Sequence, residues 1–257
     1  MKLTVMQESP IKHVIVFGPP KAGKTELVGK LAEKKRLVWF DLERGVSTLF
    51  KLPEKWKERV EVIQIPDTRA MPMAIETCLK VIKGAPVKVC EEHGKVSCPL
   101  CTKEGKPQVD VHLNSLTPDD VVVFDSITQL TNSCVANITR GKPDDYKLER
   151  DDWGHLLKVM DMFFSFVQAA PFNVVCISHE SEVEMNNGGK KLVPTAGSSN
   201  FARNFAKYFD EVVYCEVKNK KHIFASSTTY SNGILTGGRS GFSLESSTEP
   251  KLLDLWR

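Results

Sequence analysis

The chain has 257 residues, of which 41% are hydrophobic, so it is long enough to bury one large core. Lys and Arg outnumber Asp and Glu by only 35 to 32, which excludes a uniformly basic chain and requires any basic surface to be local. No run approaches the roughly 20 apolar residues that cross a bilayer, and residues 1–10 lack the apolar stretch of a signal peptide. We therefore expect one domain over residues 1–257, in the cytoplasm, with no membrane partner.

The cysteines point to the same compartment. The chain has seven, an odd number, and three of them fall within twelve residues. This distribution is typical of reduced thiols and metal ligands rather than of a disulfide framework. The other four, Cys78, Cys134, Cys176 and Cys215, lie in apolar stretches and are predicted to be small core residues.

Short apolar runs alternate with segments of helical period along the chain. The runs predict buried parallel strands at residues 14–17, 37–40, 60–65, 121–124, 174–177 and 212–214. The helical segments between them cover residues 26–34, 73–83, 127–138 and 146–170. Such alternation predicts an α/β fold, a mostly parallel sheet with helices on both faces.

Two stretches interrupt this alternation. Residues 84–110 are rich in Gly, Pro, Lys and Cys and are interpreted as an insertion, whereas residues 184–200 are interpreted as a long mobile loop. A helix is expected over residues 201–209, where a Phe recurs every four residues, a spacing typical of the buried side of a helix. Trp153, near the start of the longest helix, is expected to pack against the sheet.

After the first apolar run comes Gly18-Pro19-Pro20-Lys21-Ala22-Gly23-Lys24-Thr25, which fits G-x-x-x-x-G-K-T and leads into a helical segment. The glycines allow positive φ angles and a close backbone approach, so that successive N–H groups point at phosphates. Lys24 would reach the β and γ phosphates, and the Thr25 hydroxyl would bind Mg²⁺. The motif therefore predicts a site for Mg-ATP; the alternative is an ordinary Gly-rich turn between a strand and a helix.

Two carboxylates are predicted to complete this site. Asp125 follows a strand of four apolar residues, at the end where open α/β sheets bind ligands, and can hold the Mg²⁺ hydration shell opposite Thr25. Asp41 and Glu43 follow the strand at 37–40, and Glu43 is well placed to orient the water that attacks ATP. A helix N-cap role for Asp41 or Glu43 is the alternative.

The insertion contains a candidate metal site. Cys90 and His93, and then Cys98 and Cys101, form two pairs of metal-ligand residues within twelve residues. Two such knuckles can converge on one tetrahedral Zn²⁺ with three thiolates and one imidazole, and the metal could supply the folding energy of this polar segment. Reduced surface cysteines without metal are the alternative, because the gap between the pairs is shorter than in common zinc ribbons or fingers.

The ordered motifs resemble the RecA-like recombination ATPases, especially the short phage-encoded members that act on single-stranded DNA. The matching pieces span residues 11 to about 241 and are Gly18 to Thr25, Asp41 to Glu43, Val121 to Asp125, Val174 to Glu180 and Val217 to Lys220. The resemblance implies a RecA-like P-loop NTPase core, with Glu43 as the water-activating residue. Assembly as a homo-oligomeric ring or filament is a further expectation, although the chain has no room for the flanking domains of full-length RecA.

Other site residues follow from the resemblance alone. Ser178 and His179 become candidates for sensing the γ-phosphate, and a structural hydrogen bond is the alternative for His179. Lys218 and Lys220 match lysines that reach the nucleotide of the next subunit, and an exposed basic turn is the alternative. Arg239 is a second candidate for such a finger.

A loop at the position of residues 185–200 contacts single-stranded DNA in RecA-like proteins. By that resemblance Lys190, Lys191 and Arg203 are candidates to neutralise DNA phosphates. A solvated loop without DNA contact is the alternative.

These observations predict a DNA-dependent ATPase of RecA-like fold that acts in recombination, repair or strand annealing. Its cofactors would be ATP, Mg²⁺ and Zn²⁺, its partner single-stranded DNA, and its location the cytoplasm, that of the host if the protein is phage-encoded. A nucleotide or small-molecule kinase shares the phosphate loop but usually carries an Arg-rich lid, whereas the long loop here contains Asn, Gly and Lys. A third hypothesis is a non-hydrolysing interaction module in which the insertion docks a partner protein.

Overall fold

The computed structural model describes residues 9–185, 188–228, 230–241, 243–244 and 251–256. Its main sheet is built from β1 (His13–Phe17), β2 (Arg36–Asp41), β3 (Val60–Gln64), β6 (Asp120–Asp125), β7 (Asn173–Ser178), β10 (Glu211–Lys218), β11 (Lys221–Ala225) and β12 (Gly237–Gly238). The strand order is β11-β10-β1-β7-β6-β2-β3, with β12 also paired to β10. All pairs from β10 to β3 are parallel, while β11 and β12 run antiparallel to β10. The predicted mostly parallel sheet is confirmed.

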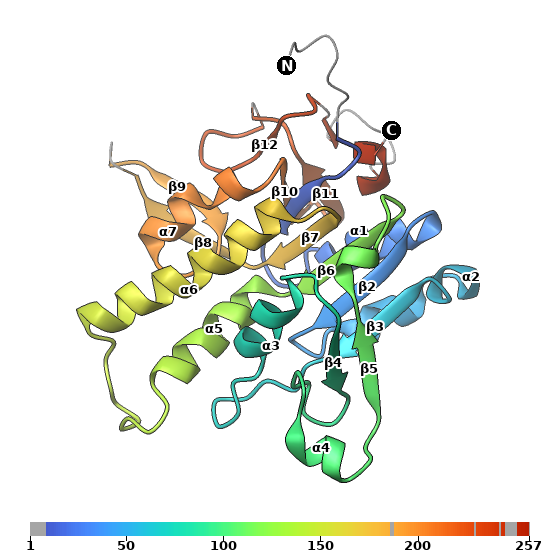
Figure 1. Ribbon diagram of the computed structural model, residues 1–257. Helices are drawn as coiled ribbons and strands as arrows, with labels where there is room; N and C mark the ends of the chain where they lie inside the picture. The colour runs from blue at the N-terminus through green and yellow to red at the C-terminus, as the bar shows by residue number, and fades with distance from the viewer. Residues whose placement is uncertain (1–8, 186–187, 229, 242, 245–250, 257) are drawn as a thin grey trace, which may run out of the picture.

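Helices cover both faces of this sheet (Figure 1). On one face lie α3 (Ala74–Val81), α5 (Ile127–Ile138), α6 (Arg150–Ala169) and α7 (Ser199–Asn204), which continues into a 3₁₀ helix at Phe205–Tyr208. The other face is covered by α1 (Lys24–Gly29), α2 (Glu54–Lys57) and the 3₁₀ helices Lys30–Glu33, Val46–Lys51 and Leu252–Trp256. The two cores follow from the alternation of side chains along the strands, since Ile15 and Phe17 face one core and Val14 and Val16 the other.

The predicted insertion forms a small sheet of its own. The strands β4 (Val87–Cys90) and β5 (Gln108–Val111) pair antiparallel, with α4 (Pro99–Lys103) between them, and the 3₁₀ helix Leu113–Ser115 leads back to the main sheet. Figure 1 shows this unit beside β3, the edge strand of the main sheet.

The prediction of one long loop at 184–200 is wrong in part, because residues 184, 190–194 and 199–200 lie in strands or in a helix. Strands β8 (Glu180–Glu184) and β9 (Lys190–Pro194) form an antiparallel hairpin instead. Val183 and Val193 project from it and pack with Ala202 of α7, and this apolar contact holds the hairpin against the helix. Asn186 and Asn187, which suggested a loop, lie outside the described residues.

The structure also tests the predicted first helix, the position of Trp153 and the predicted core residues. The helix predicted from residue 26 to 34 is α1 followed by a 3₁₀ turn, and Trp153 is 44% exposed instead of packed against the sheet. The core positions are confirmed: the described structure buries Phe201, Phe205 and Phe209 and all four of the predicted core cysteines. Among the described residues, no helix is both long and apolar enough to cross a membrane.

Candidate nucleotide site

The backbone of the predicted phosphate loop requires glycine at two positions. Gly18 has a φ of 149°, and a Cβ there would lie 2.0 Å from the carbonyl oxygen of Cys215 on β10. Gly23, just before α1, has a φ of 90°. Within the loop Lys21 also adopts a left-handed conformation, with a φ of 64°, and together with Pro20 it is exposed. The close approach and positive φ angles expected from the motif are therefore present.

Lys24 is folded back onto the loop that precedes it. Its Nζ donates hydrogen bonds of 2.8 Å to the carbonyl oxygens of both Gly18 and Pro19. Burial lowers the pKa of this ammonium, although the nearby carboxylates of Asp125 and Glu43 oppose that shift. A phosphate oxygen that replaced these two carbonyls would give the buried cation a full opposite charge.

The strand ends beside the loop are in register, which brings the predicted polar residues together. Phe17 on β1 lies opposite Ser178 on β7, and Asp125 on β6 lies opposite Asp41 on β2. The Thr25 hydroxyl donates a hydrogen bond of 3.2 Å to Asp125 Oδ2. The two predicted Mg²⁺ residues thus meet at the carboxyl edge of the sheet, where open α/β sheets bind ligands.

The two aspartates are buried at this edge. Burial and the charge of Glu43 raise the pKa of Asp125 to about 7, and the hydrogen bond from Thr25 offsets only part of this effect. Burial also raises the pKa of Asp41, whose Oδ1 accepts a hydrogen bond of 2.9 Å from the N–H of Gly45. Asp41 therefore caps the turn after β2, while the carboxylate of Asp125 fits a divalent cation with hard oxygen ligands.

Glu43 is held by two side chains that directly follow the strands β6 and β7. The Ser126 hydroxyl donates to its Oε1, and His179 Nε2 lies 3.5 Å from its Oε2. Burial would raise the pKa of Glu43, but the hydrogen bonds from His179 and Ser126 outweigh it and lower the pKa below its ordinary value. Glu43 is therefore kept ionised, as a water-orienting carboxylate needs to be.

Sequence reasoning missed Ser126 and Thr128. Ser126 follows Asp125 through a cis peptide bond and caps α5 by accepting a hydrogen bond of 3.3 Å from the N–H of Gln129. The Ser-x-x-Gln spacing is a capping signal that could have revealed it. Thr128 Oγ1 accepts a hydrogen bond of 2.9 Å from the N–H of His179 and so helps to position this residue beside Glu43.

Ser178 and His179 join the site to the β8–β9 hairpin. The buried Ser178 hydroxyl lies 2.9 Å from the carbonyl oxygens of His179 and Thr195, and the N–H of Thr195 donates a 2.8 Å hydrogen bond to the His179 carbonyl. Its hydroxyl is thus engaged with the base of the hairpin. The imidazole of His179 faces Glu43, and its Nδ1 is buried with no partner in the described part of the chain.

The candidate DNA residues lie on the hairpin and on α7. Lys190 forms an exposed ion pair of 2.6 Å with Glu182, and Lys191 is half-buried on the same strand. Arg203 is half-buried on α7 and donates a 3.2 Å hydrogen bond to Asn200. Because α7 packs against both strands of the hairpin, all three belong to one unit.

The basic residues that are candidates to reach the nucleotide of a neighbouring subunit do not lie together. Lys218 and Lys220 are exposed at the tip of the β10–β11 hairpin. Arg239 is paired with Asp210 at 3.1 Å, at the amino end of β10, which is the end of the sheet away from the phosphate loop.

The predicted metal ligands converge in the small sheet. One ligand atom from each of Cys90, His93, Cys98 and Cys101 lies within 4.8 Å of all the others. His93 Nδ1 is 3.1 Å from Cys101 Sγ, and the N–H of Lys95 donates to Cys90 Sγ at 3.4 Å. Backbone N–H groups of α4 lower the pKa of the Cys98 thiol to about 7, which favours the thiolate. Three thiols and an imidazole in one closed cluster fit a structural Zn²⁺.

The metal cluster is connected to the nucleotide site through Ile65, which directly follows β3. Gly94, inside the first knuckle, is packed so closely on Ile65 that a Cβ would lie 2.7 Å from the Ile65 Cα. The Gly94 carbonyl also accepts a 2.6 Å hydrogen bond from Thr77 of α3. Ile65 in turn donates its N–H to the carbonyl of Asp41 at 3.0 Å. The knuckle therefore supports the end of β2, two residues before Glu43.

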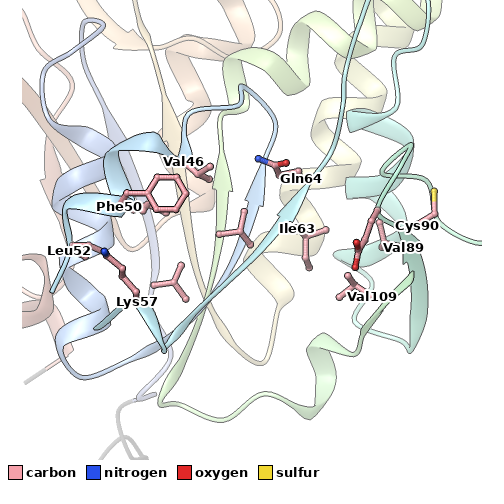
Figure 2. A pocket seen from close by; sticks show the side chains of 13 residues that line it. Val46, Phe50, Leu52, Lys57, Ile63, Gln64, Val89, Cys90 and Val109 are labelled. Carbon is pink, nitrogen blue, oxygen red and sulfur yellow. The ribbon is translucent and has the colours of Figure 1, made fainter. Parts of the chain in front are cut away.

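A separate cavity of about 580 Å³ lies between the small sheet and the outer strand of the main sheet. Figure 2 shows its mostly apolar lining, with Phe50 and Leu52 on one side and Val89 and Val109 on the other. Its lining residues include none from the phosphate loop and none of the carboxylates Asp41, Glu43 and Asp125, so this cavity is not part of the nucleotide site.

A family model described as "AAA domain" matches residues 11–243. The chain belongs to this family. A comparison of this AAA domain chain with curated proteins finds no match. A crystal structure of the RadB recombinase is similar over 83% of the chain and 79% of RadB, with a TM-score of 0.41 and 15% identity.

The AAA domain match and the described site agree on the coarser part of the prediction. The phosphate loop after β1, the acid at the end of β6 and the sheet between two helical layers form a P-loop ATPase core. Such a core binds ATP, usually with Mg²⁺.

Proposed function

We propose that this protein hydrolyses ATP in response to single-stranded DNA and acts in recombination, repair or strand annealing. The observation that supports it best is that Glu43 touches His179, the residue from which the β8–β9 hairpin starts. A ligand that moves the hairpin would therefore act on the carboxylate that orients water. The finer resemblance to short phage-encoded ATPases belongs to this proposal as well.

The hydrolytic part uses residues at the carboxyl edge of the sheet. Loop N–H groups and Lys24 would bind the triphosphate, and Thr25 and Asp125 would hold Mg²⁺, which when bound offsets phosphate charge. Glu43, ionised and held by Ser126 and His179, would orient the attacking water. Ser178 would sense the γ-phosphate only through His179, because its own hydroxyl is engaged with the hairpin.

The partner part rests on basic side chains. Lys190, Lys191 and Arg203 would neutralise DNA phosphates along the hairpin and α7.

We also propose that Zn²⁺ binds to Cys90, His93, Cys98 and Cys101, and that residues 1–257 form one domain. Copies of the chain would assemble so that Lys218 and Lys220 reach a neighbouring nucleotide.

The test is the steady-state ATPase rate with and without single-stranded DNA across a salt series. We expect stimulation by DNA that weakens as salt rises, because phosphate contacts release counterions. Equal rates with and without DNA, together with no salt-sensitive binding, would reject the recombination role. Transfer of labelled γ-phosphate to a nucleoside monophosphate would favour a kinase instead, and the absence of multiple turnover would favour an interaction module.

Two variants separate binding from hydrolysis. Lys24→Ala should lose Mg-ATP binding and turnover, whereas Glu43→Gln should keep binding and lose roughly 100-fold or more in turnover. Glu58→Gln, an exposed glutamate outside the site, is the matched control. Full turnover in Glu43→Gln would remove this residue from the mechanism.

A further inference from the structure

The edge strand β11 places one aromatic pair next to the phosphate loop. Asn219 and Lys220, with φ angles of 51° and 61°, form the two-residue turn between β10 and β11 and set Val217 opposite His222. His222 and Phe224 are two residues apart on β11, so they project from the same side of the strand. Their rings are stacked with an interplanar angle of 11° and a centroid separation of 6.5 Å.

The His222 ring lies against the last part of the phosphate loop. Its Nδ1 is 3.0 Å from the carbonyl oxygen of Ala22, and a Cβ on Gly23 would lie 2.9 Å from the same nitrogen. A carbonyl oxygen can only accept a hydrogen bond, so Nδ1 carries the hydrogen and donates it to Ala22. The contact joins residues 200 positions apart in the chain.

We propose that His222 is a positioning residue for the phosphate loop. In a planar trans peptide the carbonyl and the following N–H point in opposite directions. When His222 holds the Ala22 carbonyl on the β11 side, the N–H of Gly23 is directed to the opposite side, into the loop that is expected to bind phosphates. This inference rests on the proposed nucleotide binding and adds a residue that no part of the loop motif predicts.

The position of His222 favours this role over a purely structural one. The residue is exposed on the outermost strand of the main sheet, so its ring contributes little to the core. Its hydrogen bond instead orients a loop donor before nucleotide arrives, and a donor oriented in advance reduces the ordering cost of binding. Loss of the bond should therefore weaken binding of phosphates more than it weakens folding.

Three variants measure this effect by calorimetric titration with Mg-ATP and Mg-ADP. His222→Phe keeps an aromatic ring on Phe224 without a donor, His222→Asn supplies an amide N–H close to the position of Nδ1, and Lys24→Ala reports loss of the loop itself. We expect His222→Phe to weaken both nucleotides about fivefold, the effect of one partly exposed hydrogen bond, and His222→Asn to recover most of that loss. The melting temperature without nucleotide should change little in either variant.

The outcomes distinguish this inference from the proposed function. Wild-type affinity in His222→Phe, or equal losses in His222→Phe and His222→Asn, would overturn the positioning role while Mg-ATP binding by the wild-type protein stood. A matching fall in the melting temperature of His222→Phe would assign the residue to folding instead. A wild-type protein that bound no Mg-nucleotide would overturn both proposals.

Discussion

At the scale of single residues, the acids at the ends of β2 and β6 are buried, and burial of a carboxylate is costly unless it is paired. Asp125 is only 4% exposed and Asp41 only 1%, and they end adjacent strands in register. Asp41 is partly compensated by the N–H of Gly45, while Asp125 accepts a hydrogen bond from Thr25 and is attracted by the Lys24 ammonium, and neither effect offsets its burial. A buried carboxyl with so little compensation is typical of a functional position, and here a bound cation would provide the missing charge.

Replacement of Asp125 by Asn should stabilise the nucleotide-free protein at high pH. Because the pKa of Asp125 is raised from 3.8 to about 7 by folding, the folded chain binds more protons between these pH values, and its free energy of unfolding falls as pH rises through this window. The gain from Asp125→Asn should be larger at pH 8 than at pH 5, by on the order of 2 kcal/mol. Urea unfolding at both pH values measures it.

The control for this experiment is Asp145→Asn, which changes an exposed aspartate. An equal gain at both pH values, or a loss at pH 8, would mean that the carboxyl of Asp125 is not destabilised by its burial. Asp125→Asn should also lose ATPase activity, so that stability and function change in opposite directions.

At the scale of elements, the small sheet combines the cluster of three cysteines and a histidine with a few apolar residues that join the main core. Apart from the three cysteines of the cluster, its buried apolar residues are few, and they include Val89, Val96 and Val111. Gly94 and Thr77 connect the knuckle to Ile65 and α3. Loss of a metal from the cluster would therefore affect the strand that adjoins Glu43 as well as the small sheet.

Removal of zinc should destabilise the protein measurably. We expect one zinc per chain by elemental analysis, and a loss of this zinc in His93→Ala but not in His112→Ala, an exposed histidine of the same region. A loss of about 2 kcal/mol would lower the melting temperature by roughly 4–8 °C for a chain of this size. Zinc-free protein of unchanged melting temperature would show that the cluster folds as plain reduced thiols.

At the scale of the whole molecule, the strand order brings distant segments to one edge. The phosphate-loop strand β1 lies beside β7, which carries Ser178 and leads to His179, and β7 lies beside β6 with Asp125. The nucleotide site and the β8–β9 hairpin are therefore separated by a single residue, His179. This short connection is the physical basis for the proposed response of ATP hydrolysis to DNA.

Loss of the hairpin lysines should reduce the salt dependence of DNA binding. For single-stranded DNA each phosphate contact contributes a slope of about 0.7 in log K against log salt, so Lys190→Ala with Lys191→Ala should reduce the slope by roughly 1.4. Lys80→Ala is a matched control, because Lys80 is ion-paired with Glu76 as Lys190 is with Glu182. Fluorescence anisotropy across a salt series measures the slope, and an unchanged slope would move the DNA site elsewhere.

Features encoded in short segments could be predicted from the residues alone. The phosphate loop depends on the φ angles and small size of Gly18 and Gly23, which neighbouring residues make recognisable, and the metal ligands lie within twelve residues. Buried strands such as β6 were predicted because a strand covered on both faces needs a continuous apolar run. The helix α5 was predicted with its observed bounds, Ile127–Ile138, for a similar reason: its period is a local property.

How these segments meet depends on long-range packing, which local patterns do not reveal. Glu43, Ser126 and His179 come from three strand ends far apart in the chain, and their contact follows from strand order, which no local pattern encodes. The β8–β9 hairpin escaped prediction because its few apolar residues become informative only when α7 packs on them. His222 likewise touches the phosphate loop because β10 pairs with β1, a long-range pairing stabilised by burial of the whole sheet.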